Sequence, residues 1–284
     1  MIKLVECPRD AMQGLKTFIP TEIKANYLNQ LLKVGFDTID FGSFVSPKAI
    51  PQMRDTADVL KQLNLSDTAS RLLAIVANQR GAKDATSFEE IAYLGYPFSI
   101  SETFQLRNTN ATIEESLERV QDIQELCLGT GKQLVIYISM GFGNPYGDDW
   151  NVEIVQKWVD RLVDMGISII QLSDTIGVST GESIRYLFDN LLPLYENVEI
   201  GAHLHTAPRT WEEKVAAAYE SGCRRFDGAI KGYGGCPMAK DDLTGNMPTE
   251  NMVYYFEKEK AGLSLDQEAF SKAMLIAQEI FPNY

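Results

Sequence analysis

The feature that most constrains the fold is a regular alternation of short apolar segments with longer amphipathic segments along the 284 residues. The short segments are predicted strands, and the longer ones repeat apolar residues every three or four positions, as helices do. The predicted strands are Ile2–Glu6, Thr38–Gly42, Arg71–Ala77, Pro97–Glu102, Gln133–Ser139, Ser168–Ser173, Glu199–His203 and Arg225–Ala229. The helices predicted between and after them are Thr21–Lys33, Ile50–Leu63, Ala82–Tyr93, Thr112–Leu128, Val152–Met165, Gly181–Leu192, Arg209–Ser221 and Thr249–Glu259.

Eight strand–helix units in about 250 residues are the dimensions of a TIM barrel, in which each parallel strand is followed by a helix on the outside. We therefore predict an α/β fold, a (β/α)8 TIM barrel that forms one domain over residues 1–284 and carries an added C-terminal helix at Asp266–Phe281. A doubly wound open sheet is the competing layout. The sequence has no glycine-rich dinucleotide fingerprint and no P-loop to favour it.

Charge and composition exclude several classes of protein. A net charge of −13 and a pI of about 4.7 argue against a nucleic-acid binder, because such proteins displace phosphate counterions with basic patches. No apolar run approaches the roughly 20 residues of a membrane-spanning helix, and the N-terminal segment has no apolar signal region. The four cysteines are scattered rather than paired. We therefore expect no nucleic-acid or membrane partner, reduced thiols and a cytoplasmic location.

The strongest functional signal is His203-Leu204-His205, which holds both histidines of the chain at the end of a predicted strand. Residues i and i+2 of a strand point to the same face, so both imidazoles are expected at the mouth of the barrel. Asp10 follows the first strand, which ends at the same rim. Together they would form an open carboxylate–imidazole site that suits Mg or Mn. The alternatives are a surface or hydrogen-bonded pair of histidines, and a turn or N-cap role for Asp10.

Three further residues have chemistry that suits such a site. Arg9 could form an ordinary salt bridge, or it could stabilise an anionic oxygen with its fork of donors. Cys236 lies in a glycine-rich segment, where a thiol could act as an acid, base or nucleophile instead of being buried and inert. The amide oxygen of Asn246 could complete a metal shell, and the competing role of an Asn after a Gly is a turn residue.

These residues form a pattern that resembles the 3-hydroxy-3-methylglutaryl-CoA lyase family, a branch of a metallolyase barrel superfamily. The similarity runs nearly end to end. The segments Ser43–Met53 (SFVSPKAIPQM) and Gly234–Pro237 (GGCP) match features specific to the lyase branch, whereas the Arg-Asp and His-x-His pairs are common to the superfamily. The other matching segments are Val5–Gln13, Thr112–Ser116, Ser173–Val178 and Gly245-Asn246.

The resemblance implies a divalent-metal-dependent lyase that cleaves a 3-hydroxy-3-methylglutaryl-CoA-like thioester to acetyl-CoA and acetoacetate by retro-Claisen chemistry. The implied metal ligands, for Mg or Mn, are Asp10, His203, His205 and Asn246. The implied catalytic residues are Arg9 for the enolate, Cys236 as the acid/base, and Asp174 and Asp40. The residues expected to contact the acyl-CoA substrate are Gln13, Ser43 and Lys48. A homodimer is compatible with these expectations.

Positions that differ from the family pattern surround the substrate rather than the metal. Asp40 replaces a family Glu, Thr206–Arg209 replaces a different sequence after the second histidine, and Val135 precedes the tyrosine strand where an Arg is expected. These differences leave the acyl group open. They also leave two alternative functions. One is a Claisen-type condensing enzyme that uses acetyl-CoA and a 2-oxo acid, and the other is a metal-binding barrel without catalysis, against which Cys236 argues.

Overall fold

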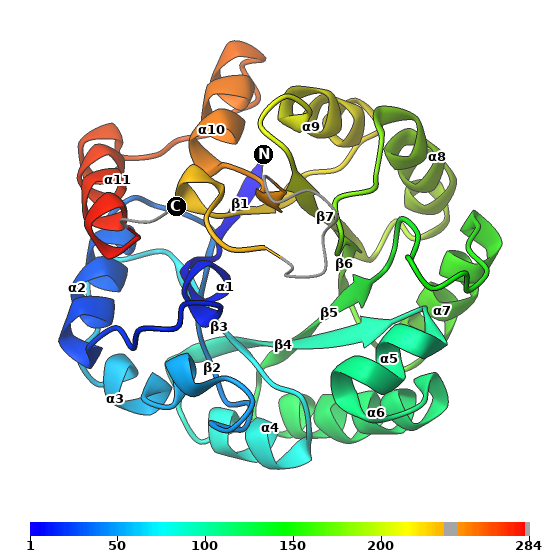
Figure 1. Ribbon diagram of the computed structural model, residues 1–284, viewed down its shortest axis with the longest axis horizontal. Helices are drawn as coiled ribbons and strands as arrows, with labels where there is room; N and C mark the ends of the chain where they lie inside the picture. Colours follow the sequence, from blue (N-terminus) through cyan, green and yellow to red (C-terminus); the bar gives the residue numbers. More distant parts are fainter. Residues whose placement is uncertain (236–243, 282–284) are drawn as a thin grey trace.

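The computed structural model describes residues 1–235 and 244–281, and this part of the chain forms a closed barrel of eight parallel strands (Figure 1). The strands lie in the order β6-β5-β4-β3-β2-β1-β8-β7, and a pairing of β6 with β7 closes the ring. They are β1 (Lys3–Glu6), β2 (Thr38–Ser43), β3 (Arg71–Ile75), β4 (Ile91–Ser99), β5 (Gln133–Ser139), β6 (Ile169–Asp174), β7 (Glu199–Thr206) and β8 (Arg225–Gly228). The predicted TIM barrel is confirmed.

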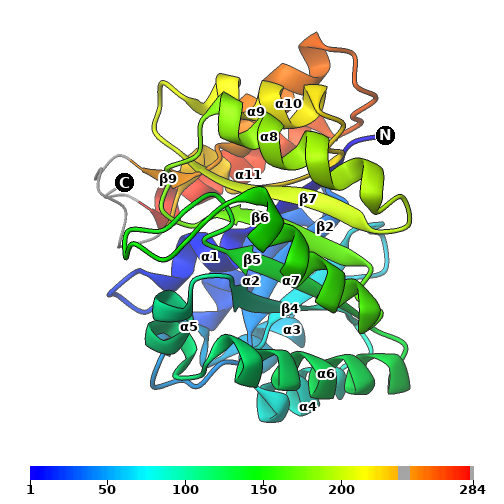
Figure 2. The same ribbon diagram turned by 90° about the vertical axis from the view of Figure 1, so that its right-hand side faces the viewer.

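Helices surround the strands on the outside, and Figure 2 shows α6, α7 and α8 running beside the barrel wall. The α-helices are α1 (Pro8–Gln13), α2 (Thr21–Leu31), α3 (Thr56–Leu60), α4 (Gln79–Thr86), α5 (Glu102–Thr109), α6 (Ile113–Gly129), α7 (Val152–Asp164), α8 (Gly181–Leu191), α9 (Trp211–Glu220), α10 (Thr249–Lys258) and α11 (Gln267–Ile280). Short 3-10 turns are η1 (Pro51–Met53), η2 (Leu192–Leu194) and η3 (Ile230–Gly232). The predicted capping box of α6 is present, because Thr112 and Glu115 bond each other's backbone N–H groups.

The fourth unit differs from its prediction. The predicted helix 82–93 was wrong at its C-terminal end, since α4 stops at Thr86 and β4 already begins at Ile91. Residues 91–95 pair with β3 and residues 93–99 with β5, so sheet pairing overrides the helical spacing of the local sequence. The predicted strand 97–102 was also wrong at its end, because Glu102 begins helix α5, which Ser101 caps through the N–H of Phe104.

Two other differences concern short helices. The predicted helix 50–63 is divided into η1 and the five-residue α3. Helix α1 was not predicted, although Pro8 at its first position is a favourable start. The added C-terminal helix is present as α11. Within the described residues, no helix combines the length and the apolar character needed to cross a membrane.

The two larger apolar clusters of the described residues hold the barrel together. The larger lies between the strands and the surrounding helices. The smaller is made of buried side chains from β3 to β6, namely Leu73, Ile75, Tyr93, Val135, Tyr137 and Ile169. Ile75 and Tyr137 also line the cavity at the barrel mouth, and alternate residues of a strand share one face, so this smaller cluster forms part of the barrel interior below that cavity.

Candidate active site at the carboxyl ends of the strands

Helix α1 turns directly out of β1 and presents three polar side chains to the barrel mouth. Arg9 and Gln13 are four residues apart and therefore lie on one face of the helix. The Arg9 Nη1 donates to Asp10 Oδ1 at 3.1 Å and to Gln13 Oε1 at 2.9 Å, and Gln13 Nε2 donates to Asp10 Oδ1 at 2.6 Å. Arg9 and Asp10 are both about nine-tenths buried. The short helix thus fixes the three side chains as one unit.

Asp40 of β2 completes this unit from the neighbouring strand. Its carboxylate accepts hydrogen bonds from Nε and Nη2 of Arg9, and Asp40 is fully buried. A guanidinium has five N–H donors, and the bonds to Asp40, Asp10 and Gln13 use four of them. The guanidinium is therefore held in a fixed orientation at the barrel mouth. Its fifth N–H group has no partner among the described residues and could serve a ligand.

The two histidines of β7 are oriented by different partners. Nδ1 of His203 bonds Oδ2 of Asp227, on the adjacent strand β8, at 3.0 Å. Nδ1 of His205 lies 3.0 Å from the carbonyl oxygen of Thr175. Burial lowers the pKa of His205, and the charge of His203 lowers it further. Burial also disfavours the charged form of His203, but the hydrogen bond and charge of Asp227 outweigh it and raise the pKa of His203.

Asp10, His203 and His205 come together as predicted. Each offers a ligand atom, and these atoms all lie within 4.8 Å of one another. The buried Nε2 of His205 has no hydrogen-bond partner among the described residues, which is the state expected of a nitrogen that binds a cation. Burial opposes the ionised form of Asp10, yet Arg9 and the two histidines lower its pKa, so the carboxylate is charged. The donor set therefore fits a divalent metal ion.

Asn246 reaches the site on a two-residue strand, β9 (Gly245–Asn246), that pairs antiparallel with the end of β7. In this pairing Asn246 stands opposite His205. Its Nδ2 donates to Asp10 Oδ2 and to the carbonyl oxygen of Tyr233, both at 2.8 Å. The residue is thus in contact with the proposed metal ligands, and its amide nitrogen is the atom that faces Asp10.

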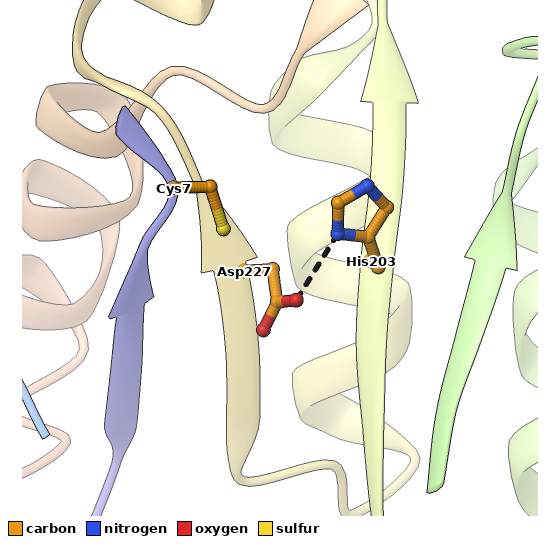
Figure 3. Close-up of side chains that lie close together, drawn as sticks. All are labelled: Cys7, His203 and Asp227. Atoms are coloured by element: carbon orange, nitrogen blue, oxygen red, sulfur yellow. Dashed lines mark hydrogen bonds and ion pairs between the residues drawn. The ribbon is translucent and has the colours of Figure 1, made fainter. Parts of the chain in front are cut away.

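A second group of potential ligands overlaps the first. Cys7, at the N-terminus of α1, lies with His203 and Asp227 so that one ligand atom of each is within 4.8 Å of the others. Figure 3 shows the Cys7 sulfur and the Asp227 carboxylate on the same side of His203. Burial raises the pKa of Cys7 well above its ordinary value, and the nearby carboxylates Asp227 and Asp40 raise it further. The thiol is therefore protonated, and Asp227 serves His203 as a hydrogen-bond partner.

A cavity of about 410 Å³ opens above these groups. Its lining combines the Asp10 and histidine cluster with apolar side chains and several neutral polar ones. The lining residues are Arg9, Asp10, Gln13, Val45, Ala49, Ile50, Ile75, Ala77, Pro97, Phe104, Asn108, Thr109, Tyr137, Ser139, Ser173, Thr175, His203, His205 and Gly235. The buried hydroxyl of Tyr137 has no hydrogen-bond partner in the described part of the chain, and its ring packs edge-on against His203. A polar ligand group in the cavity would satisfy that hydroxyl.

The other predicted residues lie apart from this cluster or outside the described residues. Ser43 is buried and donates to the carbonyl oxygen of Ile75, and Lys48 is exposed; neither lines the cavity. The Asp174 carboxylate accepts bonds from the turn that follows β6 and from a lysine, and it too is absent from the cavity lining. Cys236 lies outside the described residues, directly after Gly235, which lines the cavity.

Sequence reasoning missed two charged residues that support the site, Asp227 and Lys214. Asp227 is two positions beyond the start of β8 and holds His203, which is 24 residues away. Lys214 is on α9 and reaches Asp174, which is 40 residues away. The signal available in the sequence for Asp227 is an acidic residue inside an apolar strand. Lys214 carries no such signal, because α9 has charged residues on its exposed face as well.

The fold and the site define a TIM barrel with a buried carboxylate–imidazole cluster at the carboxyl ends of its strands. The chain belongs to the HMGL-like family, which it matches over residues 2–276. It is 33% identical over 254 residues to the hydroxymethylglutaryl-CoA lyase of Bacillus subtilis, which covers 88% of this chain and 83% of the relative. It is 32% identical over 256 residues to the cytoplasmic 3-hydroxy-3-methylglutaryl-CoA lyase of Mus musculus, covering 89% of this chain and 73% of the relative.

Solved structures agree with these relatives. The Bacillus subtilis HMG-CoA lyase superposes with a TM-score of 0.92 at 31% identity, covering 99% of this chain and 94% of the other. An HMG-CoA lyase from Acinetobacter baumannii, in complex with coenzyme A and 3-methylmalate, superposes with a TM-score of 0.90 at 30% identity, covering 99% and 92%. The predicted resemblance to this lyase family is confirmed.

Proposed function

We propose that this chain is a carbon–carbon lyase that cleaves 3-hydroxy-3-methylglutaryl-CoA, or a close analogue, to acetyl-CoA and acetoacetate. The observation that carries the proposal is the convergence of Asp10, His203 and His205 beside Arg9, in the cavity of a barrel that belongs to the HMGL-like family. Relatives that match most of the chain are named as lyases of this substrate. One related structure holds coenzyme A, which supports an acyl-CoA substrate.

The proposed cofactor is one divalent ion, Mg or Mn, held by Asp10, His203 and His205 with Asn246 beside them. Such an ion would supply the Lewis acidity that lowers the pKa of the substrate's tertiary hydroxyl. The mixed oxygen and nitrogen ligands suit these metals better than a closed thiolate site would. Asp227 keeps His203 in a fixed orientation by bonding its Nδ1, as second partners of metal-binding histidines do.

The reaction breaks one carbon–carbon bond and moves one proton from the hydroxyl oxygen to C2. The hydroxyl loses its proton, its oxygen becomes a carbonyl, and the bond between C2 and C3 of the acyl chain breaks. The electron pair passes to C2 and the thioester oxygen as an enolate. Arg9 is the cationic partner proposed for that enolate, and the bonds to Asp40 and Gln13 hold its guanidinium in place without reorganisation. Cys236 is proposed as the acid/base: its thiolate takes the hydroxyl proton, and the resulting thiol returns that proton to C2, so no net proton is gained or lost.

The remaining site roles are proposals of the same kind. Asp40 and Gln13 act by orienting Arg9, and Tyr137 offers a substrate oxygen its hydroxyl, which is unpaired within the described ranges. Lys48 is exposed and suits the charged groups of coenzyme A, while Ser43 supports the loop after β2.

We also propose one barrel domain over the whole chain, a cytoplasmic location and a homodimer. Named relatives include both cytoplasmic and mitochondrial forms.

The proposal is tested by measuring acetoacetate formation from 3-hydroxy-3-methylglutaryl-CoA. We expect turnover with Mg or Mn, loss of turnover with a chelator, and recovery when the metal is restored. Cys236→Ser should lower kcat by about 100-fold or more, while Cys127→Ala, whose thiol is buried in α6, should retain activity. If no 3-hydroxy-3-alkylglutaryl-CoA is cleaved under these conditions, the chain is not the proposed lyase.

A further inference from the structure

The buried ammonium of Lys214 lies directly behind the candidate metal site. Lys214 is only 2% exposed, although lysine is rarely found in the interior. Its Nζ donates to Asp174 Oδ2 at 2.8 Å, to the carbonyl oxygen of His205 at 2.7 Å and to that of Gly177 at 3.3 Å. An ammonium has three donors, so these three acceptors use all of them.

The three acceptors belong to two segments whose relative position determines the geometry of the site. Asp174 is the last residue of β6 and Gly177 lies in the turn that follows it, whereas His205 is next to the last residue of β7. The same turn supplies the carbonyl oxygen of Thr175 to Nδ1 of His205, at 3.0 Å. A carbonyl oxygen only accepts, so Nδ1 carries the proton. The lone pair is then on Nε2, the buried atom that lacks a partner among the described residues.

Asp174 accepts hydrogen bonds from the turn after β6, and its side chain does not line the cavity. Its Oδ1 accepts the N–H of Val178 at 2.8 Å, and its Oδ2 accepts the N–H and the hydroxyl of Ser179 at 3.1 and 2.5 Å. Asp174 is 1% exposed. The carboxylate therefore shapes the turn, and Lys214 joins that shaped turn to the main chain of His205.

We infer that Lys214 is a positioning residue for metal binding, which it serves by clamping the turn after β6 to the backbone of His205. The clamp fixes where the Thr175 carbonyl stands, and so fixes the tautomer and the direction of the His205 imidazole. The inference rests on the proposed metal site. Outer partners of metal-binding histidines are worth about 10- to 100-fold in metal affinity, which is the range expected here.

A buried lysine elsewhere in the chain provides a matched control. Lys24 is also 2% exposed, and its Nζ also bonds one carboxylate, Asp55, and one carbonyl, that of Gln52. None of these three residues lines the cavity. Replacing either lysine by methionine removes a buried ammonium and leaves a buried carboxylate without its cation. The two substitutions should therefore affect stability alike and differ only in their effect on the metal site.

The experiment measures the Kd of Mn²⁺ for the full-length, metal-free chain by titration calorimetry. We expect Lys214→Met to raise that Kd about 10- to 100-fold and Lys24→Met to leave it within about twofold. A Lys214→Met protein that is folded and binds Mn²⁺ as tightly as the wild type overturns the inference. A wild-type chain that binds no Mn²⁺ overturns the proposed metal site, and the inference with it.

A double variant separates positioning from charge neutralisation and covers the case in which Lys214→Met does not fold. Lys214→Met with Asp174→Asn has no unpaired buried charge, so part of the lost stability should recover, although the amide keeps only one of the two acceptor oxygens that hold the turn. Asp174→Asn alone, in which Lys214 is still present to bond the carbonyls of Gly177 and His205, is the control for that loss. We expect the Mn²⁺ affinity of the double variant to stay low, and full recovery would overturn the inference. The chain has two histidines, so their imidazole nitrogen NMR signals can be assigned. The His205 tautomer should be Nδ1-protonated in the wild type and mixed in the double variant.

Discussion

Glu6 is a buried acid that links the two sides of the segment containing Cys236. It is fully buried at the end of β1. Its Oε1 accepts the N–H of Ile230 at 2.9 Å, and its Oε2 accepts the hydroxyl of Thr249 at 2.5 Å. Burial raises the pKa of Glu6 from its ordinary value of 4.5 to about 8, although both hydrogen bonds oppose this rise. Near neutral pH the side chain is therefore largely a neutral acid.

Replacing Glu6 by glutamine should change how stability depends on pH. Because the folded-state pKa is raised, the protonated acid favours folding below pH 4.5, and this contribution is lost as pH rises towards 8. Glutamine cannot ionise, so the stability of Glu6→Gln should rise relative to that of the wild type by about 1.4 kcal/mol per pH unit across that window. Denaturant unfolding at several pH values measures the difference. The exposed Glu118→Gln is the control, and parallel curves for Glu6→Gln and the wild type would contradict the prediction.

The site residues that belong to a short sequence motif could be predicted. The residues whose role depends on a partner far away in the sequence could not. The sequence predicts Asp10, His203 and His205 because strand ends of a barrel share one rim, and the structure brings them together. The support of His203 by Asp227 is a contact between different strands. Lys214 of α9 contacts the backbone of His205 and the turn after β6. The contact of His203 with Asp227 and that of Lys214 with the turn after β6 join residues that are far apart in the sequence, so no local sequence pattern predicts them.

At the scale of elements, the two-residue strand β9 carries Asn246 to the site through a close approach of two backbones. A Cβ on Gly245 would lie 2.4 Å from the carbonyl oxygen of Gly232, well inside the contact limit. Backbone atoms cannot move aside as the end of a side chain can. Glycine at this position therefore lets β9 lie against the backbone of η3 while it pairs with β7 on its other side.

Gly245→Ala should displace β9 and separate Asn246 from Asp10 while the barrel stays folded. We expect kcat/KM for the proposed lyase reaction to fall at least about tenfold, as expected when a ligand-supporting contact is lost. Gly129→Ala is the matched control, because a Cβ there meets nothing within 4 Å and alanine favours the helix α6. A Gly245→Ala enzyme with wild-type kcat/KM would show that β9 does not need this close approach.

The order of strands and helices could be predicted because each long element has its own periodicity. Strands β5 and β6 were predicted within one residue at each end, since they are apolar runs bounded by polar residues. The start of β4 was wrong because Ile91 and Ala92 follow Phe88 at the three- and four-residue spacing of a helix, and only pairing with β3 identifies this segment as strand. Strand β9 is two residues long and has no period at all, so its pairing with β7 could not be read from the sequence.

At the scale of the whole molecule, α11 joins the first and last units of the barrel. Its first half packs on the N-terminal side, where the rings of Phe270 and Phe36 meet edge to face at 6.1 Å. At its end, the ring of Phe281 contacts Tyr27 of α2 and Tyr233, which follows η3. The helix thus covers the junction between the first and the last strand–helix units of the barrel. Figure 1 shows it in red beside α2.

Because α11 covers this junction, its buried face should contribute to the stability of the whole barrel and not to catalysis. Phe270 is 5% exposed, and Phe270→Ala should lower the free energy of unfolding by about 3–5 kcal/mol. Leu275 on the same helix is 64% exposed, so Leu275→Ala should cost less than about 0.5 kcal/mol. Denaturant unfolding measures both changes. At a temperature where both variants are folded, their kcat/KM should equal that of the wild type, because α11 supplies no side chain to the cavity. A Phe270→Ala protein as stable as Leu275→Ala would mean that the barrel closes without α11.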